Sequence, residues 1–129
     1  MTTNLKKYLG IDWGEKRIGL AMADSETKLA IPFKVVSNLN ELIKIIIAEE
    51  INYLVIGYPR KMNGDPANNP KWHDFVWRLE KQVDIPLIFL DERLSSLAAD
   101  ALAKKTKAKA GRDEIAAALI LQNYLDGAR

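Results

Sequence analysis

The chain has 129 residues, of which 48% are hydrophobic and 28% charged, and its net charge is +2. This length suits one domain covering residues 1–129 and excludes a multidomain enzyme. With no cysteine and one histidine, the chain excludes disulfides, thiol nucleophiles, thiolate zinc sites and clustered-histidine metal sites. Any bound metal should therefore have carboxylate ligands, which suit Mg²⁺ or Mn²⁺.

The sequence shows no sign of secretion or membrane insertion. Residues 1–7 are polar and lack the apolar run of a signal peptide. No stretch reaches the roughly 20 apolar residues that span a bilayer. We therefore expect a cytoplasmic protein with no membrane partner.

The first 36 residues predict three strands. The apolar runs Tyr8 to Asp12 and Arg17 to Ala23 are separated by glycine and charged residues, which is typical of a β-hairpin. The next run, Ala30 to Val36, contains Pro32. Because proline cannot donate a hydrogen bond to a sheet, this strand should lie at an edge.

Helices and strands alternate in the rest of the chain. Asn38 and Glu41 resemble a capping box, and two apolar stripes at helical spacing follow along the chain. The stripes are Leu39, Leu42, Ile43, Ile46 and Ile47, then Trp72, Phe75, Val76, Leu79 and Val83. Short apolar runs at Tyr53 to Gly57 and Leu87 to Leu90 predict strands covered on both faces, and Leu97 to about Lys104 and Asp113 to Leu125 predict helices. This order predicts an α/β fold with parallel crossovers behind a hairpin.

Acidic residues lie at the ends of three predicted elements. Asp12 ends the first strand, where open α/β sheets place functional groups, although an aspartate also suits a turn. Asp91 and Glu92 end the last strand, and side-chain alternation lets only one of them face a site shared with Asp12. Asp113 and Glu114 begin the last helix, where both also suit capping.

A basic segment without acids lies just before the last helix. Its cations are Lys104, Lys105, Lys107, Lys109 and Arg112. Carboxylates beside such a segment suit two divalent cations, about 3.5–4 Å apart, acting on a phosphodiester. The rigid end of a central strand is the best place for a carboxylate that bridges both ions, which favours Asp12.

Four motifs resemble those of the YqgF (RuvX) family of Holliday-junction-resolvase-like nucleases. They are Leu9 to Gly19 (LGIDWGEKRIG), Val55 to Pro59 with Met62 to Gly64, Asp91 to Ser96 (DERLSS), and Asp113 to Leu121. The motifs follow the family order over nearly the whole chain. The resemblance implies a ribonuclease H-like fold with a five-stranded mixed sheet flanked by helices.

The resemblance also implies an activity and a site. It identifies Asp12, Glu92 and Asp113 as catalytic, metal-ligating acids that hold Mg²⁺ or Mn²⁺, with two ions expected. The implied activity is nuclease maturation of the precursor of small-subunit ribosomal RNA (pre-16S rRNA), with the ribosome as a further partner. The alternatives are a Holliday-junction resolvase acting on branched DNA and a catalytically idle nucleic-acid-binding module. A monomer or a weak homodimer is expected.

Several other residues have two possible interpretations, one functional and one purely structural. Lys16, Arg17, Arg93 and the basic segment are expected to contact phosphate, the alternative being solvated surface charge. Glu15 departs from the family, where threonine is often found, and it adds an acid near the expected metals. Trp77 lies off its helical stripe, so it either stacks on a base or packs under a loop.

Overall fold

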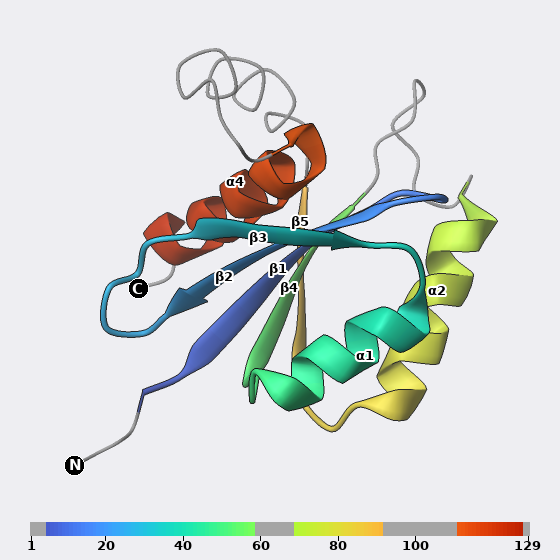
Figure 1. Ribbon diagram of the computed structural model, residues 1–129, viewed down its shortest axis with the longest axis horizontal. Helices are drawn as coiled ribbons and strands as arrows, with labels where there is room; N and C mark the ends of the chain where they lie inside the picture. The colour runs from blue at the N-terminus through green and yellow to red at the C-terminus, as the bar shows by residue number, and fades with distance from the viewer. Residues whose placement is uncertain (1–4, 59–68, 92–110, 128–129) are drawn as a thin grey trace.

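The protein forms a five-stranded sheet with helices on both faces (Figure 1). The structure is a computed structural model, and it describes residues 5–58, 69–91 and 111–127. The elements in chain order are β1 (Lys7–Trp13), β2 (Ile18–Asp24), β3 (Ile31–Val36), α1 (Leu39–Ala48), β4 (Tyr53–Tyr58), α2 (Pro70–Gln82), β5 (Leu87–Asp91) and α4 (Arg112–Gly127). The helix predicted from Leu97 to about Lys104 lies outside the described residues.

The sheet is mixed, with strand order β3-β2-β1-β4-β5. β1, β4 and β5 run parallel, whereas β1 pairs with β2 and β2 with β3 in antiparallel fashion. The predicted front hairpin, parallel crossovers and edge position of Pro32 are thus confirmed. The three parallel strands bring their carboxyl ends to one edge of the sheet, where such folds place their functional groups.

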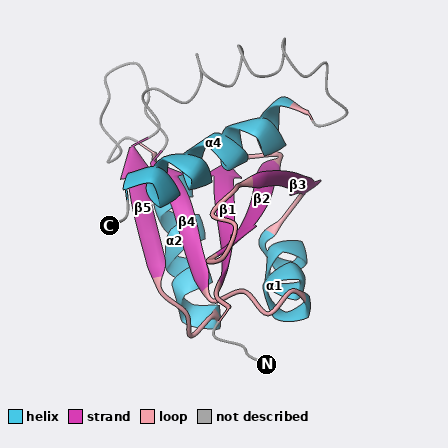
Figure 2. Ribbon diagram, turned by 90° about the vertical axis from the view of Figure 1, so that its left-hand side faces the viewer, coloured by secondary structure: helices cyan, strands magenta, loops and turns pink. Residues whose placement is uncertain are grey.

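Side-chain alternation divides the sheet into two faces. Leu9 and Ile11 of β1 pack toward α1 and α2, so Tyr8, Gly10 and Asp12 point toward α4. Figure 2 shows α4 crossing the strands on one side, with α1 and α2 behind them. Asp12 therefore lies on the face that α4 covers.

Each of the two helices on the face opposite α4 is capped at its N-terminus by an asparagine, Asn38 before α1 and Asn69 before α2. The Glu41 amide donates to Asn38 Oδ1 at 2.9 Å, and the Ser37 amide donates to Glu41 Oε1 at 2.7 Å, close to the predicted capping box. The Trp72 amide donates to Asn69 Oδ1 at 3.1 Å, with Pro70 at the first helical position. None of the described helices is long and apolar enough to cross a membrane.

Helix α4 packs closely on the other face because β1 offers a glycine there. A Cβ added to Gly10 would lie 2.7 Å from the Ala117 carbonyl oxygen and 2.8 Å from Leu121 Cβ. Farther along α4, Gln122 accepts a hydrogen bond from the Ala30 amide at 2.8 Å and donates one to the Lys28 carbonyl at 3.1 Å. Backbone contact and side-chain hydrogen bonds together fix the helix on the sheet.

Replacing Gly10 with alanine should destabilise the protein. The added methyl overlaps α4, and overpacking of this kind costs about 1–3 kcal/mol in the free energy of unfolding. Urea denaturation measures the loss. The control is Gly127→Ala on α4, where a Cβ meets nothing within 4 Å and no loss is expected. Equal stability of the Gly10→Ala variant and the parent protein would contradict this packing.

Candidate active site

Asp12 lies near the carboxyl end of the central strand β1, half-buried and facing α4. Its antiparallel neighbour in β2 is Gly19. On the other side, Ile11 pairs with Ile56 of β4, so the residue beside Asp12 on that strand is Gly57. Since glycine has no side chain, neither neighbouring strand crowds the Asp12 carboxylate on this face of the sheet.

The register of α4 over β1 brings Asp113 to the same place. Tyr124 lies against Tyr8, with ring centroids 6.0 Å apart, and Ala117 and Leu121 lie against Gly10. The helix and the strand therefore run in opposite directions. Two residues along a strand advance about 6.7 Å, and four residues along a helix advance about 6.0 Å, so the two spacings nearly match. Moving from Gly10 to Asp12 on β1 thus corresponds to moving from Ala117 to Asp113 on α4.

The contact with Gly19 confirms this register. A Cβ added to Gly19 would lie 2.1 Å from the Asp113 carbonyl oxygen and 2.9 Å from Asp113 Cβ. Because Gly19 is also the cross-strand partner of Asp12, both aspartates lie against the same glycine. Two of the three predicted acids, Asp12 and Asp113, are therefore brought together although they lie 101 positions apart along the chain.

The two acids at the start of α4 have different surroundings. The helix begins at Arg112, one residue earlier than predicted. Arg17 Nε lies 3.1 Å from Asp113 Oδ2, so the Asp113 carboxylate is directed toward the β1–β2 hairpin. Glu114 instead folds back over the helix start, where its Oε1 would lie 2.8 Å from a Cβ on Gly111. This placement favours Asp113 as the functional acid and gives Glu114 a position suited to capping.

Other predicted residues are exposed at or near this edge, or lie outside the described residues. Lys16 and Arg112 are exposed. Glu15 forms an ion pair of 3.5 Å with Lys71 of α2, on the opposite face from α4. The remaining predicted residues lie outside the described ones: Glu92, Arg93, Lys104, Lys105, Lys107 and Lys109.

The described part of β5 follows the predicted alternation. Leu87 and Phe89 pack toward α1 and α2, whereas Ile88 and Leu90 pack with α4. Within the described ranges, no group of three or more histidine, cysteine, aspartate or glutamate side chains could hold a metal ion. Asp12 and Asp113 supply two carboxylates of the kind that hard cations prefer.

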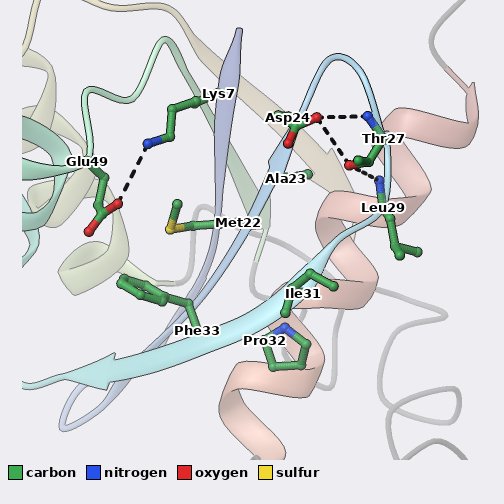
Figure 3. Close-up of a pocket in the computed structure, with 10 residues that line it drawn as sticks. All are labelled: Lys7, Met22, Ala23, Asp24, Thr27, Leu29, Ile31, Pro32, Phe33 and Glu49. Carbon is green, nitrogen blue, oxygen red and sulfur yellow. Dashed lines mark hydrogen bonds and ion pairs between the residues drawn. The ribbon is translucent and has the colours of Figure 1, made fainter. Parts of the chain in front are cut away.

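A hollow of about 460 Å³ lies at the opposite edge of the sheet (Figure 3). Met22, Ile31 and Phe33 line it. Lys7 and Glu49 also line it and form an ion pair, with Lys7 Nζ 3.7 Å from Glu49 Oε1. Lys7 and Asp12 are five residues apart on β1, which amounts to about 17 Å of strand. The hollow is thus separate from the paired acids.

Trp77 is 59% exposed on α2, with Lys81 Nζ 5.1 Å from its ring centroid. This tryptophan belongs to the helical layer opposite α4. It is therefore not directed at the acids.

Sequence reasoning missed the two glycines that position the site. Gly10 and Gly19 lie inside predicted strands, where an interior glycine often marks a close backbone approach. That signal was present, but it does not say which element approaches. The pairing of Arg17 with Asp113 was also missed, because it joins residues far apart along the chain.

Comparison with known proteins links this chain to one family. A profile of the RuvX family, described as Holliday junction resolvase, matches residues 6–127. A Maridesulfovibrio salexigens protein named "Putative pre-16S rRNA nuclease" is 37% identical over 131 residues, which cover 92% of this chain and 97% of that protein. A Roseiflexus protein of the same name is 33% identical over 141 residues and aligns over the whole of both chains.

Solved structures of low sequence identity share the fold. Thermus thermophilus RuvC, in complex with a Holliday junction substrate, has a TM-score of 0.58 at 14% identity, covering 95% of this chain and 96% of RuvC. Fowlpox virus resolvase, in complex with Holliday junction DNA, has a TM-score of 0.56 at 9% identity, covering 93% of this chain and 97% of the resolvase. The predicted ribonuclease H-like fold is confirmed.

Replacing Gly19 with alanine should move the start of α4. The added methyl would overlap the Asp113 backbone, which cannot rotate away as a side chain can. Backbone amide NMR shifts should therefore change most at residues 111–117 and at Arg17. In Gly10→Ala the largest shifts on α4 should instead centre on Ala117 and Leu121. Unchanged shifts at residues 111–117 in Gly19→Ala would contradict the contact.

Proposed function

This chain belongs to the RuvX family, described as Holliday junction resolvases, and we propose that it is a nuclease that hydrolyses phosphodiester bonds with the help of divalent cations. One observation carries the proposal: Asp12 and Asp113 lie against the same glycine, at the sheet edge where the parallel strands end. No histidine or cysteine ligand is needed at such a site, because Mg²⁺ and Mn²⁺ prefer oxygen.

Three acids would hold the cations. Asp12 is rigid because its strand is hydrogen-bonded on both sides, and Asp113 is fixed through its backbone at Gly19. We assign the third position to Glu92, which follows two residues after Leu90, a residue that packs with α4. When bound, one or two Mg²⁺ or Mn²⁺ ions would activate water and stabilise charge on the leaving oxygen.

Basic residues around the acids would bind the phosphate backbone. Lys16 and Arg17 lie at the hairpin, and Arg112 lies at the start of α4. To these we add Arg93 and the lysines of the basic segment, Lys104, Lys105, Lys107 and Lys109. Contacts with phosphate position a nucleic acid without reading its sequence, so these residues would serve RNA and DNA alike.

The proposed substrate is the precursor of 16S rRNA, after the names of the relatives that align over nearly their whole length. Such a role would place the protein in the cytoplasm, in contact with ribosomal precursors. Branched DNA is the second candidate, since the matching profile is described as Holliday junction resolvase. Symmetric cutting of a four-way junction would require a dimer, whereas RNA cleavage would not.

Asp12→Asn tests the proposed site. Loss of the carboxylate charge should lower cleavage at least about 100-fold while leaving nucleic acid binding nearly unchanged. The assay compares pre-16S rRNA, single-stranded RNA and four-way branched DNA in Mg²⁺ or Mn²⁺. The matched control is Asp84→Asn, which removes an exposed carboxylate just before β5, away from the paired acids, and should cut like the parent protein.

Each outcome of the assay decides something. Asp12→Asn cutting as well as the parent protein would refute the assignment of the acids. Cleavage restricted to branched DNA would favour the resolvase role. If the parent protein binds nucleic acid and cuts none of the three substrates, the protein is a binding module and not a nuclease.

A further inference from the structure

The guanidinium of Arg17 forms an ion pair with Asp113, one of the proposed metal ligands. Its Nε lies 3.1 Å from Asp113 Oδ2. The pair does not depend on the ionic contact alone, because Gly19, two residues after Arg17, packs against the Asp113 backbone. The hairpin and α4 therefore present these two side chains to each other at a fixed junction.

This ion pair is open to competition. The Arg17 side chain is 72% exposed and that of Asp113 is 31% exposed. Ion pairs at such exposed positions are weak, so another cation can displace the guanidinium at little cost. A divalent cation carries twice the charge of Arg17 and coordinates the carboxylate oxygen directly, so it competes with Arg17 for Asp113.

The neighbouring acid of the hairpin has a different ion-pair partner from Arg17. Glu15, the acid nearest to Arg17 along the chain, forms an ion pair with Lys71 of α2 at 3.5 Å. Lys16 is exposed and carries the same formal charge one residue away. It therefore provides a control that separates the contact with Asp113 from the general effect of a nearby positive charge.

We propose that Arg17 is a displaceable counter-ion: it neutralises Asp113 in the metal-free protein and moves to a phosphate oxygen of the nucleic acid once a divalent cation takes the Asp113 carboxylate. This inference rests on the proposed nuclease function. Arginine suits both partners, because its planar fork of donors matches carboxylate and phosphate. The exchange couples the two binding events, so a bound cation frees Arg17 for the substrate.

Two measurements on Arg17→Gln test the exchange. In the absence of nucleic acid, loss of the competing cation should tighten Mn²⁺ binding about two- to five-fold, as measured by electron paramagnetic resonance of free Mn²⁺. In cleavage assays at saturating Mn²⁺, loss of the phosphate contact should raise KM about ten-fold. The Mn²⁺ affinities of Lys16→Gln and of Arg17→Lys should stay within about two-fold of the parent protein, because Arg17 or a lysine charge still faces Asp113.

If Arg17 has only a structural role, its replacement should not tighten Mn²⁺ binding. If folded Arg17→Gln binds Mn²⁺ no more tightly than the parent protein, or if Lys16→Gln tightens Mn²⁺ binding equally, the exchange is refuted. Should Arg17→Gln fail to fold, Arg17→Met keeps the aliphatic stem and gives the same comparison, and unfolding of both variants would also refute the exchange.

Asp113→Asn separates this inference from the proposed function. If Asp113→Asn binds Mn²⁺ as well as the parent protein, Asp113 is not a ligand and the proposed site fails. If Asp113→Asn loses Mn²⁺ binding while Arg17→Gln gains none, only the inference about Arg17 fails.

Discussion

The close contact between α4 and the bare backbone of β1 and β2 is the constraint on which the rest of the structure depends. Ala117 and Leu121 pack against Gly10, and the Asp113 backbone packs against Gly19, at distances that no side chain on either glycine would allow. Glycine weakens a strand, so these positions carry a cost that burial of the apolar face of α4 offsets. The packing of α4 on this face buries its apolar side chains and also places Asp113 beside Gly19, the cross-strand partner of Asp12. The stability of the fold and the geometry of the site therefore depend on the same contact.

The β1–β2 hairpin distributes charge between the two helical layers. On one side its Glu15 pairs with Lys71 of α2, and on the other its Arg17 pairs with Asp113 of α4. Exposed pairs of this kind add little to the free energy of unfolding. Their effect is on placement, because they hold Glu15 on the α2 side of the sheet and Arg17 beside Asp113 on the α4 side.

Local patterns predicted the elements well, because burial acts through periodicity. Asn38 caps α1 as its spacing to Glu41 indicates, and Asp12 lies near a strand end. What those patterns could not provide was the register of α4, since a helical stripe says which face is buried but not which strand it covers. The family resemblance already favoured Asp113 over Glu114, and the register of α4 adds a physical reason, because it brings the Asp113 backbone against Gly19, the cross-strand partner of Asp12.

A double-mutant cycle of Mn²⁺ binding tests the central claim most directly. Affinities are measured for the parent protein, Asp12→Asn, Asp113→Asn and the double variant, each shown to be folded. If the packing of α4 gives both aspartates one shared metal site, either single change should remove most of the binding and the second should add little. Losses that add independently, or an affinity that neither change alters, would contradict the shared site.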